Sequence, residues 1–147
     1  MPRVSPAYPH LLVNHLPVVV ALVASVLLAI AVWRGTVTAA IYGYGAQMAV
    51  AVLAIVAYVT GNFAPPALDH VAGIATDRIT FHQITAAAAM IASVLVGLLS
   101  FIPIYFPSIT ARRGVVIGYL VLSLALCTLF AYTASTGGSI RHTELSP

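Results

Sequence analysis

Four long runs of apolar residues, each free of Asp, Glu, Lys and Arg, dominate the chain. They cover residues 16–33, 37–60, 79–106 and 115–134, and more polar segments separate them. A helix needs about 20 consecutive apolar residues to cross the hydrocarbon core of a bilayer. Each run therefore predicts one membrane-spanning helix, and the whole pattern predicts an all-α integral membrane protein. We expect a single domain over residues 1–147, with the four helices in an up-down bundle.

Prolines and glycines mark where these helices begin and end. Pro17 fits the first turn of the first helix, where a missing N–H leaves no helical hydrogen bond unmade. We expect Gly61 to end the second helix, and Gly137-Gly138 to end the fourth in a flexible turn. A longer link joins the second helix to the third. In this link, residues 66–72 predict one short surface helix that carries a histidine.

The composition supports lipid as the surrounding solvent. Hydrophobic residues make up 61% of the chain and charged residues only 6%, whereas a soluble domain carries about 25% charged residues. The net charge of +3 is too small for a nucleic-acid-binding surface. The single cysteine, Cys127, excludes an intramolecular disulfide, a covalent Cys-x-x-Cys-His haem and an iron–sulfur cluster.

The arginines predict the orientation of the bundle. Arg34, Arg112 and Arg113 occupy the two short links between helices, and no acidic residue accompanies them. By the positive-inside rule this end faces the cytoplasm. We therefore predict a multi-pass protein of the bacterial inner membrane with both termini on the periplasmic side. The same topology places every histidine on the periplasmic side; these are His10, His15, His70, His82 and His142.

Histidines at the start of a span are functional candidates, because an ionisable residue in a membrane helix is costly. Imidazole binds iron, copper and zinc. The spans contain no glutamate, which argues against a di-iron carboxylate site. A helical bundle with histidines on facing helices suits a non-covalent haem. His10 precedes the bundle among prolines, and we expect it to be a surface residue. The candidate iron ligands for one or two b-type haems are His15, His70, His82 and His142.

Two arginines and a row of small residues accompany these histidines. Arg78 and Arg141 lie near the same surface, either as ordinary interfacial charges or as partners for haem propionates. Small residues follow His82 along one helical face. This face either permits close helix packing or clears room for a flat cofactor beside His82. The small residues are Ala86, Ala89, Ser93, Gly97 and Ser100, and Gly114-x-x-x-Gly118 opens the fourth span.

Both ends of the bundle sequence resemble a known family. The segment Leu-Leu-Val-Asn-His-Leu-Pro-Val at residues 11–18, and Gly-Gly-Ser-Ile-Arg-His at residues 137–142, are similar to small bacterial four-helix membrane proteins. That family opens with His-(Phe/Leu)-Pro and closes with Gly-Gly and a basic residue beside a histidine. The resemblance implies a b-type cytochrome or a partner of a respiratory oxidoreductase, with His15, His82, His142 and then His70 as functional positions. Asp69 and Thr143 stand where relatives often carry glutamate and proline.

These observations lead to one expected function and several alternatives. We expect an electron-transfer subunit of a respiratory or photosynthetic complex, with bis-histidine haem near the periplasmic face. It would pass electrons between a periplasmic carrier and quinone or another membrane subunit. A structural or assembly subunit without a cofactor and a non-haem metal-binding protein are the alternatives, and a transporter ranks below them because nothing charged lies mid-membrane. No nucleophile or acid–base pair indicates an enzyme.

Overall fold

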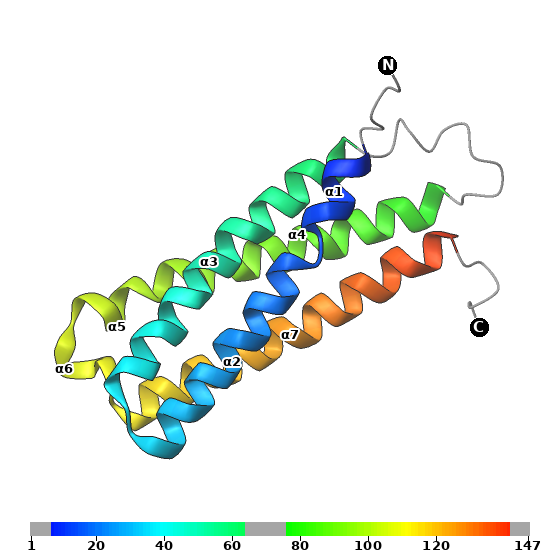
Figure 1. Ribbon diagram of the computed structural model, residues 1–147. Coiled ribbons are helices and arrows are strands. Elements are labelled where there is room, and N and C mark those ends of the chain that lie inside the picture. Colours follow the sequence, from blue (N-terminus) through cyan, green and yellow to red (C-terminus); the bar gives the residue numbers. More distant parts are fainter. Residues whose placement is uncertain (1–6, 64–75, 142–147) are drawn as a thin grey trace.

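Long helices make up most of the chain in the computed structural model, which describes residues 7–63 and 76–141 (Figure 1). The four long helices are α2 (Leu16–Arg34), α3 (Val37–Asn62), α4 (Thr76–Leu99) and α7 (Arg113–Arg141). The short helices are α1 (Ala7–Val13), α5 (Phe101–Tyr105) and α6 (Pro107–Thr110). The predicted surface helix at 66–72 lies outside the described residues.

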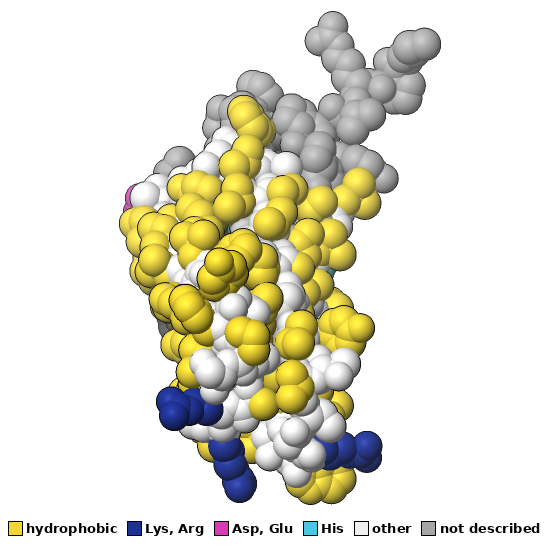
Figure 2. All heavy atoms as spheres, turned by 90° about the vertical axis from the view of Figure 1, so that its left-hand side faces the viewer, with side chains coloured by type: hydrophobic (Ala, Val, Ile, Leu, Met, Phe, Trp, Pro, Cys, Tyr) yellow, Lys and Arg dark blue, Asp and Glu magenta, His cyan; other side chains and the backbone are white. Residues whose placement is uncertain are grey.

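The helices are long and apolar enough to cross a membrane four times. The candidate spans are His10–Arg34, Val37–Asn62, Asp77–Tyr105 and Arg113–Ile140. Apolar side chains cover most of the face in Figure 2, while arginine side chains gather at one end of it. Large hydrophobic residues such as Ile84 and Val121 point outward, with 61% and 59% of their surfaces exposed. A surface of this kind needs lipid around it, so the prediction of a multi-pass helical membrane protein is confirmed.

Each long helix packs against two others, and the interior consists mainly of small residues. α2 contacts α3 and α7, and α4 contacts the same two helices. At Gly97 of α4, an added Cβ would lie 2.6 Å from the Cβ of Ala51 on α3. Small residues allow backbones to approach this closely in lipid. The close-packing interpretation of the small-residue face therefore holds at Gly97, where Ser93 and Ser100 on the same face are fully buried.

The end of the fourth helix differs from the prediction. Gly137 and Gly138 were expected to terminate it in a flexible turn, but α7 continues through both glycines to Arg141. The physical reason is a contact: an added Cβ at Gly137 would lie 3.0 Å from Cε1 of His82. The lack of a side chain at Gly137 leaves room for the His82 imidazole of α4, and the glycine does not form a turn. The left-handed helix cap in the described chain is Gly35, with φ 66° at the end of α2.

Candidate functional site

The segments α1, the end of α3, the start of α4 and the end of α7 lie at one end of the bundle (Figure 1), and two of them each contain a histidine. We call this region the histidine end. His10 belongs to α1 and His82 to α4. The opposite end of the bundle carries Arg34 and Arg113 and is called the arginine end.

His10 is held against α3 by its ring. Its Nδ1 lies 3.0 Å from the carbonyl oxygen of Ala57. An added Cβ at Gly61 would lie 3.1 Å from the ring carbon Cε1, so this glycine makes room for the imidazole. A carbonyl only accepts hydrogen bonds, so Nδ1 carries a proton, and in the neutral form of the ring the lone pair is on Nε2. His10, which was expected at the surface, is half-buried with its ring against α3.

His82 connects α4 to α7 in a similar way. Its Nδ1 lies 3.1 Å from the carbonyl oxygen of Thr133 and 3.0 Å from Oγ1 of Thr136. The Thr136 hydroxyl in turn donates to the Thr133 carbonyl at 2.8 Å. With Nδ1–H donated to the carbonyl, Nε2 of His82 is again the unprotonated nitrogen. Two histidines from different helices thus share one tautomer, each oriented by a carbonyl of a neighbouring helix.

This arrangement matches what imidazole ligands of metals require. A metal-bound histidine usually donates its other ring N–H to a carbonyl or carboxylate, which fixes the ring and its tautomer. His10 and His82 both meet this condition. One turn after His10, the buried Oδ1 of Asn14 has no hydrogen-bond partner among the described residues. Within residues 7–63 and 76–141, no group of three or more His, Cys, Asp or Glu side chains gathers.

The structure places the other predicted site residues as follows. His15 is exposed at the junction of α1 and α2 and makes no side-chain cap. Nη1 of Arg78 donates to the carbonyl oxygen of Ser139 at 2.8 Å, near the end of α7. His70, His142 and the side chain of Arg141 lie outside the described residues.

Sequence reasoning missed His10 as part of the site. Three prolines in the first nine residues suggested an irregular segment, yet Pro9 falls within the first turn of α1, where helices tolerate it. The available signal was the apolar stretch Leu11-Leu12-Val13 directly after His10. It continues the first hydrophobic run toward the N-terminus and puts His10 within the same candidate span.

The fold and the site define a class: a polytopic helical membrane protein with a pair of oriented imidazoles at one end. Comparisons with known proteins do not narrow this class. No family model matches the chain, and neither a curated protein nor a solved structure gives a significant match.

Proposed function

We propose that this chain is a membrane electron-transfer subunit that binds b-type haem at its histidine end. One observation carries the proposal: His10 and His82 each donate Nδ1–H to a carbonyl of another helix, which leaves Nε2 free to bind iron. Haem with two histidine ligands supplies one-electron chemistry and has no open coordination position. His15, His70 and His142 remain predicted ligands as well, and two of them would suffice for a second haem.

The protein's own residues would orient and tune such a group. The carbonyls of Ala57 and Thr133 fix the two rings and make them more basic ligands. Gly61 and Gly137 leave space at the ring edges that a larger side chain would fill. Arg78 uses Nη1 to bind the Ser139 carbonyl, and its other guanidinium N–H groups are suited to a carboxylate such as a haem propionate. Arg141 is the second predicted partner of a propionate.

The topology and partners of this function form part of the proposal. The helices would cross the bilayer in alternating directions, with the surface helix at 66–72 beside the histidine end. The histidine end would face the periplasm of a bacterial inner membrane. The reason is that the short links at the arginine end contain Arg34, Arg112 and Arg113 and no acidic residue, which the positive-inside rule assigns to the cytoplasm. Electrons would then pass between a periplasmic carrier and quinone or another membrane subunit of a redox complex.

A visible spectrum of the purified protein tests the proposal. Reduced minus oxidised spectra should show a sharp b-type α band, and a pyridine haemochrome assay gives the number of haems. His82→Ala and His10→Ala should each lose most of the haem that they ligate. Gln83→Ala is the matched control, because this residue adjoins His82 and its side chain makes no hydrogen bond with another described residue. A wild-type protein that is colourless after gentle purification would contradict the proposal.

A second candidate, a structural subunit without a cofactor, is favoured by the hydrogen bonds of His82. Its Nδ1 contacts both the Thr133 carbonyl and the Thr136 hydroxyl, and these bonds alone would tie α4 to α7. In that case the wild-type protein contains no haem, and His82→Ala lowers the thermal stability without changing the visible spectrum. The spectrum of the wild-type protein therefore separates the two candidates before any variant is made.

A further inference from the structure

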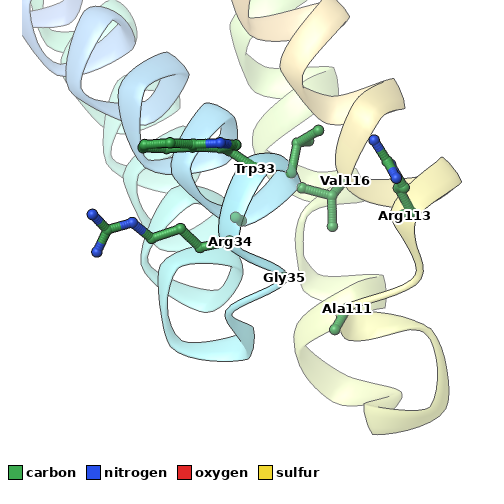
Figure 3. Close-up of a pocket in the computed structure, with 8 residues that line it drawn as sticks. Trp33, Arg34, Gly35, Ala111, Arg113 and Val116 are labelled. Carbon is green, nitrogen blue, oxygen red and sulfur yellow. The ribbon is translucent and has the colours of Figure 1, made fainter.

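The arginine end of the bundle contains a cavity of about 290 Å³. It lies between the end of α2 and the start of α7 (Figure 3). Six of the residues that line it are Trp33, Arg34, Gly35, Ala111, Arg113 and Val116. The cavity is far from the histidine end and takes no part in the proposed function.

The charge around this cavity is positive and uncompensated. Arg34 and Arg113 come from opposite sides of it, and in Figure 3 the Arg34 side chain extends away from Arg113. The guanidinium carbon of Arg34 lies 5.3 Å from the ring centroid of Trp33. Among residues 7–63 and 76–141, neither arginine forms an ion pair with a carboxylate, and the acidic residue of this part, Asp77, lies at the start of α4 near the histidine end. A bound anion would compensate this positive charge.

Backbone groups add to this positive field. α7 begins at Arg113, beside the cavity. Its opening turn is closed by a hydrogen bond from the backbone N–H of Val116 to the carbonyl oxygen of Arg112, at 3.0 Å. The N–H groups before Val116 have no carbonyl one turn earlier within the helix. The start of a long helix also carries a partial positive charge. Two arginines and a helix start therefore act on the same cavity.

The remaining walls are apolar and continue into the lipid-facing surface. Ala31 and Val116 are buried on the side toward the bundle interior. Trp33 lines the cavity and has 80% of its surface exposed, the placement of an aromatic residue at a membrane boundary. A soluble anion needs no apolar wall. A phospholipid places its phosphate at this depth and its acyl chains along the apolar surface above it.

We propose that this cavity binds the headgroup phosphate of an anionic phospholipid such as phosphatidylglycerol. The side chains of Arg34 and Arg113 are both exposed; they turn toward the phosphate and neutralise it, and the apolar wall contacts the first carbons of an acyl chain. Basic pockets between membrane helices bind anionic headgroups by this chemistry. The site is independent of the haem proposal and holds in either orientation of the chain.

The single tryptophan of the chain provides a direct test, since Trp33 lines the cavity. The protein is reconstituted into phosphatidylcholine bilayers that contain phosphatidylglycerol with brominated acyl chains, which quench tryptophan on contact. Trp33 fluorescence should be quenched more by brominated phosphatidylglycerol than by the same fraction of brominated phosphatidylcholine. Equal quenching by the two lipids would overturn the proposal.

Matched variants separate a site from diffuse attraction. Arg113→Gln should lower the preference for phosphatidylglycerol roughly fivefold, the effect of one basic residue at an anionic surface. Arg112→Gln removes the same charge from the neighbouring residue, which does not line the cavity, and should leave the preference nearly unchanged. Equal losses in both variants would overturn the site.

Inorganic phosphate should not relieve the quenching beyond the effect of chloride at equal ionic strength. If it does, the cavity binds a soluble anion and the lipid assignment fails. Circular dichroism checks that each variant is folded.

Discussion

Gln47 is the residue whose surroundings conflict most with its chemistry. It is fully buried in α3, and neither its Oε1 nor its Nε2 has a hydrogen-bond partner. A buried polar group without a partner loses its hydration and regains nothing, at a cost of about 1–3 kcal/mol. Nearby serines avoid this cost; Ser93, for example, donates to the Ala89 carbonyl at 2.7 Å.

Replacement of Gln47 by methionine should therefore stabilise the protein. Methionine has a similar length and no amide to desolvate, so we expect Gln47→Met to raise the free energy of unfolding by about 1 kcal/mol. Thermal unfolding in detergent, followed by circular dichroism, measures the change. Ser123→Ala is the control, because this hydroxyl bonds Ser25 at 2.8 Å and its removal should destabilise. A clear loss of stability in Gln47→Met would show that the amide binds a group such as a buried water.

At the same scale, the sequence predicted where histidines lie but not what they contact. Topology places His82 at the start of a span, and the structure agrees. The partners of its ring, on residues 133 and 136, depend on how α7 is rotated and how far it extends. Hydrophobic periodicity contains little of that information, since both helices are apolar around most of their circumference. Spacing along the chain shows which end of a bundle a residue occupies, and packing decides which carbonyl it reaches.

At the scale of helices, one glycine sets the distance between α3 and α4. An added Cβ at Gly97 would lie 2.6 Å from Cβ of Ala51 and 3.3 Å from the carbonyl oxygen of Gln47. Neither neighbour is the flexible end of a side chain, so the two helices would have to move apart. Gly118 of α7 differs, because an added Cβ there meets nothing within 4 Å.

We expect Gly97→Ala to destabilise the bundle by about 1–3 kcal/mol, the usual effect of overpacking. Gly118→Ala makes the same chemical change at an open position and should be neutral or slightly stabilising, because alanine favours helix. Both variants are compared by thermal unfolding under identical detergent conditions. Equal stability of the two variants would contradict the close contact of α3 and α4.

Helix boundaries show how far hydrophobic runs predict elements. The first run, 16–33, corresponds to α2 at Leu16–Arg34, within one residue at its end. Lipid exposure demands an apolar outer surface along the whole span, so the run and the helix coincide. The end of α7 was predicted too early. A pair of glycines is typical of a helix end, and the sequence does not show that His82 packs against Gly137. The Gly114-x-x-x-Gly118 motif likewise suggested a packing face, yet both glycines have open space beside them.

At the scale of the whole molecule, the two ends of the bundle have opposite character. The arginine end holds Arg34, Arg112 and Arg113 in and beside its short links. The histidine end holds two half-buried imidazoles with hydrogen bonds to backbone carbonyls. In the proposed up-down topology, chain order determines this division, because each crossing of the bilayer would return the chain to the other side. The gathering of three arginines at one end was therefore predictable from the sequence. Which end faces the cytoplasm is inferred from the positive-inside rule alone.

Cysteine labelling tests that sidedness directly. Cys127 is first replaced by serine, so that single cysteines can be placed at Asn62, exposed at the histidine end, and at Ala111, exposed at the arginine end. Basic links resist translocation, so Asn62→Cys should react with a membrane-impermeant maleimide in intact cells. Ala111→Cys should react only after permeabilisation. The reverse pattern would place the histidine end in the cytoplasm and rule out a periplasmic electron carrier as its partner, while labelling of both positions in intact cells would contradict four alternating crossings.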